Sequence, residues 1–348
     1  MKKNTPQTPV KLSNLELFIP PSKIASRSRI LSYLLLLIAT LASEANGQDP
    51  QFTQFFTNPL YLNPAFAGTY KCPRLAMNYR NEWPALSGTF VTTSVAFDKH
   101  IRDLEGGIGI LIMSDRAGGG TLNTVSGNLL YSYFKELNRF WALKAGFQVG
   151  YIQKKVDWEK LTFGDMIDPR YGFIYETAET ASSDTKGNLD ISSGILVFSK
   201  KLFGGFAVHH LTRPNEGFID QDKAQLPMKF TVHAGSVILI DGYGEDFKIS
   251  PNIIYQQQQD FRQLNFGCYL KRGPLYGGLW YRQAEGTSDS FILLTGLQMG
   301  VVQMGYSYDV TLSRLSNASG GSHELSMVLL FDCRPTSPKY RPEVCPVW

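Results

Sequence analysis

Five histidines are the first side chains to consider, because imidazole is the commonest metal ligand and a frequent general base. They are His100, His209, His210, His233 and His323. None has the i, i+4 spacing of a helical metal site, and none has a carboxylate at motif distance. His209 and His210 are adjacent, so in a strand they would point to opposite faces. The sequence therefore predicts no metal site and no cofactor.

Motifs for nucleophilic or phosphate chemistry are also missing. The sequence has no Gly-x-Ser-x-Gly elbow and no phosphate-binding loop. Gly106-Gly107-Ile108-Gly109 is rich in glycine, but it opens a segment with strand periodicity rather than a helix. Asp165, Asp168 and Glu176 share one polar segment without the spacing of a calcium loop. We expect no catalytic residue and a protein that is not an enzyme.

The elements that would carry any site form a ladder from Arg74 to Asp332. Segments of roughly ten residues alternate apolar and polar side chains and are separated by turn residues. The clearest apolar set is Val302, Met304, Tyr306, Tyr308 and Val310. Only 18% of residues are charged, and the chain has 22 Phe and 17 Tyr, which suits a wall facing lipid. The ladder predicts an all-β protein, a transmembrane antiparallel β-barrel in an outer membrane.

The ladder divides into about fourteen strands, an even number as in bacterial single-chain barrels. The expected strands are Arg74–Asn81, Thr89–Asp98, Gly106–Ser114, Thr121–Lys135, Arg139–Lys155, Asn188–Lys200, Leu202–Leu211, Leu226–Ile240, Phe247–Gln257, Arg262–Lys271, Leu275–Arg282, Ser290–Met299, Val301–Val310 and Ser322–Phe331. Asp157–Phe163 is a candidate for an additional short strand.

Connection lengths indicate the orientation of the barrel. If the first strand leaves the periplasm, the outer connections include the long Val156–Gly187, Thr212–Gln225 and Thr311–Gly321. The periplasmic ones include the tight Glu136–Asn138 and Arg272–Pro274. Long external loops and short periplasmic turns are the expected asymmetry. Both termini are then expected in the periplasm.

Two strands allow a clear assignment of faces, because a charge at the lipid midplane costs roughly 2–4 kcal/mol. We expect lipid contact for Met228, Phe230, Val232, Ala234, Ile238, Ile240, Trp141, Leu143, Ala145, Phe147, Val149 and Tyr151. We expect the lumen for Lys229, Thr231, His233, Gly235, Lys144, Gly146, Gln148 and Gly150. The many inward glycines favour close backbone packing or material inside the lumen.

Residues 1–47 have the layout of a signal peptide. The apolar run Ile30–Ala42 follows basic residues, ends near small ones, and is short for a spanning helix. This leader carries six of the 34 basic side chains and two of the 30 acidic ones, so the remainder is formally neutral. Charge therefore gives no argument for nucleic-acid binding.

Residues 48–73 form an aromatic lead-in without a regular period. Two Asn-Pro pairs prevent a regular helix or strand, and the aromatic side chains are too apolar for a free tail. Its notable residues are Phe52, Phe55, Phe56, Asn58, Pro59, Asn63, Pro64 and Ala65. We expect this segment to be buried as a plug of the lumen or at its rim. A structural clamp without further function is the alternative.

Barrel closure brings the two ends of the ladder together and places cysteines there. Cys72 precedes the first strand and Cys333 follows the last, in a Pro-rich tail of residues 333–348 that also holds Cys345. A Cys72–Cys333 disulfide is expected, with Cys333–Cys345 as the alternative. Cys268 should be a free thiol on the lipid face. The last strand ends on Phe331, which resembles the signal that such barrels present to their insertion machinery.

The chain resembles the PorP/SprF family along essentially its whole mature length. The residues that carry the resemblance are the lead-in Gln48 to Gly68, Arg80-Asn81-Glu82-Trp83, Asp157-Trp158, and Leu161-Thr162-Phe163-Gly164-Asp165. The resemblance implies an outer-membrane component of the type IX secretion system of Bacteroidetes, which supports protein export or gliding motility. It also implies other components of that system and a secreted adhesin or other cargo as partners, besides the lipid bilayer.

Two further expectations accompany this resemblance. Arg80 and Trp83 are expected to brace the first loop. Asn63-Pro64-Ala65 also resembles the hatch of FadL-like barrels, which have a similar strand number. The alternative function is therefore a FadL-like outer-membrane channel for hydrophobic small molecules.

Overall fold

The computed structural model describes residues 48–70, 72–168, 170–177, 184–218, 224–240, 247–284, 290–312 and 319–331. The expected signal peptide and the tail with Cys333 and Cys345 lie outside these residues.

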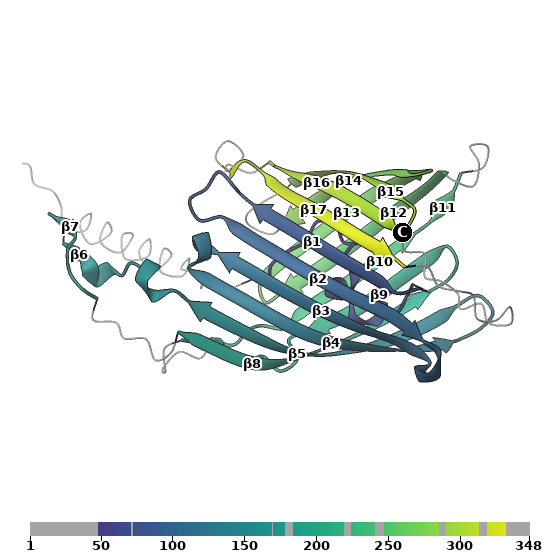
Figure 1. Ribbon diagram of the computed structural model, residues 1–348, viewed down its shortest axis with the longest axis horizontal. Helices are drawn as coiled ribbons and strands as arrows, with labels where there is room; N and C mark the ends of the chain where they lie inside the picture. The colour runs from purple at the N-terminus through teal and green to yellow at the C-terminus, as the bar shows by residue number, and fades with distance from the viewer. Residues whose placement is uncertain are drawn as a thin grey trace, which may run out of the picture. The chain divides into compact units, whose positions relative to one another are not determined.

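Fourteen long strands form the wall, as the ladder predicts (Figure 1). They are β1 (Arg74–Glu82), β2 (Phe90–Ile101), β3 (Gly106–Ala117), β4 (Leu122–Glu136), β5 (Ala142–Val156), β8 (Thr185–Phe198), β9 (Leu202–His209), β10 (Lys229–Ser236), β12 (Phe247–Gln258), β13 (Phe261–Arg272), β14 (Leu275–Ala284), β15 (Ser290–Met299), β16 (Val302–Thr311) and β17 (Ser322–Leu330). Each pairs with its sequence neighbour in antiparallel fashion, and β1 pairs with β17 from Arg74↔Leu330 to Glu82↔Ser322. The sheet is therefore a closed barrel.

Short elements interrupt the connections. A two-residue strand, β11 (Ile238–Leu239), pairs with β12, and β6 (Ile167–Asp168) pairs with β7 (Gly172–Phe173) in the long connection after β5. The expected extra strand at Asp157–Phe163 is wrong. The segment turns into a 3-10 helix, η4 (Trp158–Lys160), because the amide of Lys160 donates to the carbonyl of Asp157.

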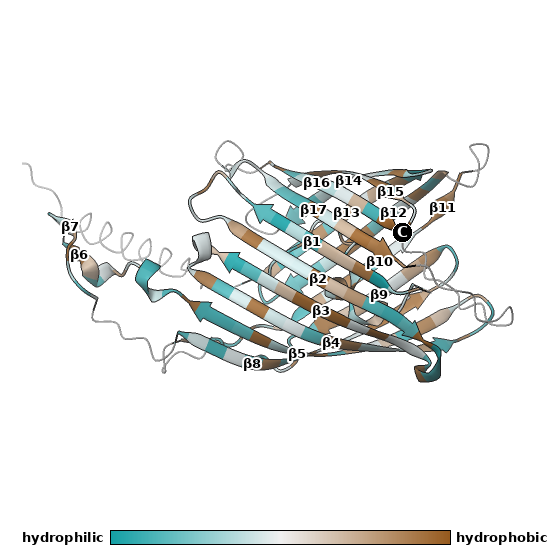
Figure 2. Cartoon of the chain, in the orientation of Figure 1, coloured by the Kyte–Doolittle hydropathy of each residue, from teal (hydrophilic) through white to brown (hydrophobic). Residues whose placement is uncertain are grey.

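The exposure of the side chains alternates along the wall. On β10, Phe230 and Val232 are exposed, whereas Lys229, Thr231 and His233 are buried. On β5, Phe147, Val149 and Tyr151 are exposed and Lys144 and Gln148 are buried. Figure 2 shows the resulting alternation of hydrophobic and hydrophilic residues along the strands. The predicted faces are confirmed for these residues. They are not tested for Met228, Ile238 and Ile240, which lie outside β10, and the neighbours Ile238 and Leu239 are both exposed.

The two ends of the barrel differ. We call the end where β1 begins and β17 ends the terminal end, and the opposite end the loop end. The connections at the loop end include the long one between β5 and β8, whereas β13 and β14 join at the terminal end through a turn at Gly273. In the described part of the chain, no helix has the length and hydrophobicity needed to span a membrane.

Candidate functional site

The lumen of the barrel is occupied by the chain's own lead-in. Asp49 lies at the loop end, where its amide donates to the Gln258 side chain at 3.1 Å. Gly68 lies near the terminal end, where its amide donates to Asp98 at 3.0 Å. The lead-in therefore passes along the lumen and leaves it next to β1. The lead-in thus starts at the end of the barrel opposite to Phe331, whose amide bonds to Pro73 before β1. Which end faces the periplasm stays a prediction.

Proline fixes the local shape of the lead-in. The one-turn helix α2 (Pro59–Leu62) and the 3-10 helix η1 (Pro64–Phe66) both begin on proline, whose ring presets a helical φ. Between them, Asn63 is extended, and its side chain accepts a hydrogen bond from the amide of Ala65 at 2.9 Å. The two Asn-Pro pairs thus produce two short turns that keep the segment compact.

From Phe52 to Thr69, every residue of the lead-in except Tyr61 is buried. The predicted residues Phe52, Phe55, Phe56, Asn58, Pro59, Asn63, Pro64 and Ala65 are all buried. The ring of Phe55 lies 5.2 Å from Trp280, and the ring of Phe56 lies 4.8 Å from Tyr269. These aromatic pairs add specific contacts to apolar burial. They place the lead-in against the wall at β13 and β14.

A charged cluster holds the middle of the lead-in. Arg80 and Arg282 both contact the Asp309 carboxylate, at 2.9 and 3.0 Å. Asp309 also accepts from the hydroxyl of Thr53 at 2.9 Å. The carboxylate of Glu324 accepts the amides of Thr53 at 2.6 Å and of Gln54 at 3.2 Å. The cluster joins four strands, β1, β14, β16 and β17, to the lead-in. Its charges are paired with one another because buried charges need partners.

The structure corrects the expectation for Arg80. Its side chain does not brace the first loop; it is 1% exposed and points into the lumen, on the same face as Arg74 and Asn78. The side chains at even positions of β1 face inward, and Arg80 follows this alternation. Trp83 does lie at the first loop, where its ring packs edge-on against Phe90 at 5.9 Å. Only Trp83 is placed where it can brace this loop.

Inward glycines allow the lead-in to touch the wall. A Cβ atom added at Gly146 would overlap the backbone of Pro64 and Ala65, and one at Gly107 would overlap the carbonyl of Ala67. The backbones therefore approach more closely than any other residue would permit. The expectation of material inside the lumen, based on these glycines, agrees with this packing.

The loop end of the lead-in is fixed by a second polar group. Nε2 of His210 lies 2.8 Å from Asp49, and its Nδ1 lies 3.1 Å from Asp190. The ammonium of Lys229 lies 3.5 Å from Asp49 and 4.6 Å from the ring centre of Tyr61. These contacts hold the beginning of the lead-in at the loop end of the barrel.

The prediction that His209 and His210 point to opposite faces is wrong. His209 lies next to the carbonyl of Leu62 and His210 next to Asp49, so both side chains face the lead-in. Both side chains are buried, because β9 ends at His209 and His210 has a φ of 58°, which breaks the strand alternation. The ring centres lie 6.4 Å apart. Nevertheless, the described residues contain no cluster of three or more potential metal ligands.

The acidic segment of the long connection is organised by its own backbone. The Asp168 carboxylate accepts the amides of Arg170 at 2.7 Å and Tyr171 at 2.9 Å. These hydrogen bonds lower the pKa of Asp168, first through the Arg170 amide. The carboxylate caps the β6–β7 turn.

Of the remaining predicted positions in the described residues, Cys72 and Phe331 lie near the seam between β1 and β17, and Cys268 lies on β13. Cys72 is disulfide-bonded; Cys333 and Cys345 lie outside the described residues, so its partner stays a prediction. Cys268 is free and half-buried on the outer face. The amide of Phe331 donates to the carbonyl of Pro73 at 3.0 Å, and the ring is exposed. Its role as an insertion signal stays a prediction.

The family model described as "Type IX secretion system membrane protein PorP/SprF" matches residues 44–329. No curated protein matches the sequence. Among solved structures, the toluene transporter TbuX of Ralstonia pickettii is similar with a TM-score of 0.47 and 9% identity, over 78% of this chain and 93% of that one.

Two other outer-membrane structures are similar at the same level. Omp33 of Acinetobacter baumannii has a TM-score of 0.45 and 7% identity, over 76% of this chain and 100% of that one. A FadL homologue of Pseudomonas aeruginosa has a TM-score of 0.43 and 11% identity, over 78% of this chain and 93% of that one.

Proposed function

This chain belongs to the PorP/SprF family of type IX secretion system membrane proteins, and we propose that it works as a non-enzymatic scaffold of that system in the outer membrane. In this role, the barrel is an anchor whose two ends bind other proteins. One end meets other components of the secretion system, and the other end holds a secreted adhesin or other cargo at the cell surface.

The observation that carries this proposal is the occupied lumen. A conducting channel needs an open path, whereas here the lead-in is held by buried ion pairs around Asp309 and by close backbone contacts at Gly146 and Gly107. Displacing it would expose these charges and apolar rings at considerable cost. A barrel filled in this way acts through its surfaces.

The long connection between β5 and β8 is the surface that we assign to cargo. It contains the β6–β7 hairpin, on which Tyr171, Phe173, Ile174 and Tyr175 are exposed. Exposed aromatic and aliphatic side chains on a loop are typical of protein contacts. The Asp168 carboxylate holds the turn of this hairpin by accepting the amides of Arg170 and Tyr171.

Two experiments test the proposal. In a strain that lacks the protein, the full chain should restore surface display of an exported protein, and a variant with residues 161–177 replaced by a Gly-Ser linker should not. The variant must reach the outer membrane in the same amount. Pull-down of the tagged full chain should recover secretion components, and recovery of none of them contradicts the scaffold role.

Uptake of hydrophobic small molecules distinguishes the alternative function, a FadL-like channel, from the scaffold. If the protein is a channel for hydrophobic small molecules, its deletion reduces uptake of such compounds and leaves the set of secreted proteins unchanged. The scaffold proposal expects the reverse result. The same deletion strain serves both measurements.

A further inference from the structure

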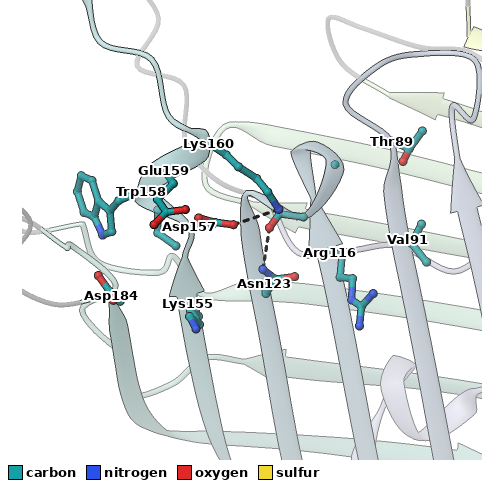
Figure 3. A pocket seen from close by; sticks show the side chains of 13 residues that line it. Thr89, Val91, Arg116, Asn123, Lys155, Asp157, Trp158, Glu159, Lys160 and Asp184 are labelled. Carbon is teal, nitrogen blue, oxygen red and sulfur yellow. Dashed lines mark hydrogen bonds and ion pairs between the residues drawn. The ribbon is translucent and has the colours of Figure 1, made fainter. Parts of the chain in front are cut away.

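A polar hollow of about 840 Å³ lies outside the lumen, at the loop end of the wall (Figure 3). Strands β2 to β5 form its floor. Its rim is formed by the 3-10 helices η3 (Gly118–Gly120) and η4, which meet through the hydrogen bond from the Asp157 amide to the Thr121 carbonyl at 2.8 Å. We call it the rim hollow.

Two cations and an amide form one row across the floor. Arg116 on β3 pairs with Asn123 on β4, and Asn123 pairs with Lys155 on β5. Figure 3 shows the three side chains on neighbouring strands. Two strand spacings separate Arg116 from Lys155, which is about 10 Å between backbones. The row thus holds two positive charges on either side of an amide, whose nitrogen donates one hydrogen bond to the Gly120 carbonyl at 2.8 Å and carries a second N–H.

The row faces outward rather than into the lumen. The preceding residue on β3, Asp115, accepts a hydrogen bond from Thr92, which is 4% exposed and faces inward. On β5, Ile152 is buried and Lys154 is partly buried in an ion pair with Glu216, whereas Tyr151, Gln153 and Lys155 are exposed. Since alternate residues of a strand face opposite sides, Arg116 and Lys155 lie on the membrane side of the wall.

The side chains of Arg116 and Lys155 have no hydrogen-bond or ion-pair partner within the described ranges. A third cation, Lys160, lies above Gly120 and pairs with Asp157 at 3.1 Å. Glu159 and Asp184 line the side of the hollow near η4 and β8. The floor is therefore cationic, and the carboxylates lie on the connecting segments.

The height of the row on the wall indicates its ligand. On β4 the outward side chains Tyr131, Leu129 and Val125 are exposed and apolar, and Asn123 follows Val125 at the next outward position. On β5 the apolar outward set ends at Tyr151, two outward positions before Lys155. The row thus begins where the apolar belt ends, which is the level of the lipid headgroups.

We propose that the rim hollow binds the phosphate-bearing headgroup of a membrane lipid. Arg116 and Lys155 contact the phosphate oxygens, because guanidinium and ammonium groups form charge-assisted hydrogen bonds to phosphate. Between them, Asn123 donates with the N–H that does not bind the Gly120 carbonyl. The carboxylates of Glu159 and Asp184, at the side of the hollow, face any positively charged group of the headgroup, such as the ammonium of phosphatidylethanolamine. Lipid A and glycerophospholipids share this phosphate chemistry. The site is independent of the scaffold role, because it requires only that the barrel lies in a membrane.

Lipid binding to the purified full chain tests the proposal. Native mass spectrometry in a mild detergent would compare three probes: lipid A, a phosphatidylethanolamine, and a diacylglycerol without phosphate. The variant carries Arg116→Ala and Lys155→Ala. The control carries Lys135→Ala and Arg262→Ala, which remove the same charge from outward positions of β4 and β13. The double variant should bind phosphate-bearing lipid at least about tenfold more weakly, and the control should match the wild type.

The probes identify the source of the phosphate. Preference for lipid A assigns the hollow to the lipopolysaccharide leaflet, and equal binding of phosphatidylethanolamine assigns it to phosphate in general; both support the site. Equal lipid binding by variant and control overturns it, as does diacylglycerol binding as tight as that of the phosphorylated probes. If the double variant binds lipid as the wild type does but no longer binds an exported protein, the hollow is a protein-binding site, and the proposal is overturned. If the double variant does not fold, Arg116→Gln with Lys155→Gln replaces it.

Discussion

Arg80 and Asp309 form an ion pair of 2.9 Å inside the barrel, although they lie 229 positions apart in the sequence. They belong to β1 and β16, and the inward Glu324 of β17 lies between them on the wall. The pair therefore crosses the seam where the first and last strands meet. Through Thr53, the same carboxylate also holds the lead-in.

Replacing Arg80 by methionine should destabilise the barrel. Asp309 keeps Arg282 as a partner but loses one of its two ion pairs, and Glu324 loses its ion pair with Arg80. Breaking a buried ion pair costs about 3–5 kcal/mol of unfolding free energy. Urea unfolding in lipid vesicles measures the change. Arg80→Lys keeps the charge and should cost less, and Arg262→Met on the outer face serves as the control. Equal stability of Arg80→Met and wild type contradicts the cluster as a structural element.

Removing residues 48–66 should open the lumen to ions. The wild-type barrel should show little conductance in planar bilayers, because its lumen is filled with buried aromatic rings and paired charges. The shortened chain should conduct if it still closes. Glu324→Gln is a milder variant, since it weakens the hold on the Thr53 and Gln54 amides. High conductance of the wild type would falsify the filled lumen.

A side chain at Gly146 should displace the lead-in. Valine there would overlap the backbone of Pro64 and Ala65, so the lead-in or the wall has to shift, at about 1–3 kcal/mol for an overpacked site. Limited proteolysis of the folded protein should then cut the lead-in, which is protected in the wild type. The matched control is Gly127→Val on the neighbouring strand β4, where an added Cβ meets nothing within 4 Å. Equal protection in both variants contradicts the close approach.

The Cys72 disulfide should stabilise the seam. Cys72→Ser should lower the unfolding free energy by roughly 2–5 kcal/mol, the usual effect of losing a native disulfide. Peptide mapping without reduction identifies the partner, and we predict Cys333. Cys333→Ser should then reproduce the loss, whereas Cys345→Ser and the free Cys268→Ser should not. A Cys72–Cys345 peptide would contradict this pairing.

The wall could be predicted from the sequence because its pattern is local. Each strand alternates lipid-facing and lumen-facing side chains, so the faces of Phe230 and Lys229 follow from two neighbouring residues. The free-energy penalty for a charged side chain in lipid enforces this pattern in every strand. The glycines at inward positions also indicated that something approaches the wall closely.

The interior could not be predicted in the same way. Arg80 meets Asp309 only because closure and register bring β1 and β16 near each other, and no local pattern encodes that distance. His210 faces the lumen because its backbone adopts a positive φ, which alternation cannot anticipate. The rim hollow is likewise a product of strand register, since Arg116, Asn123 and Lys155 lie on three different strands.

The position of the lead-in has a consequence for how the protein is assembled. Its Thr53 and Gln54 amides bind Glu324 on the last strand, while the hydroxyl of Thr57 accepts a hydrogen bond from Asn78 on the first strand. Glu324 follows Thr53 by 271 positions, so the last strand is made long after this segment. The lead-in therefore bonds to both strands of the seam, so its place in the lumen and the pairing of β1 with β17 stabilise each other.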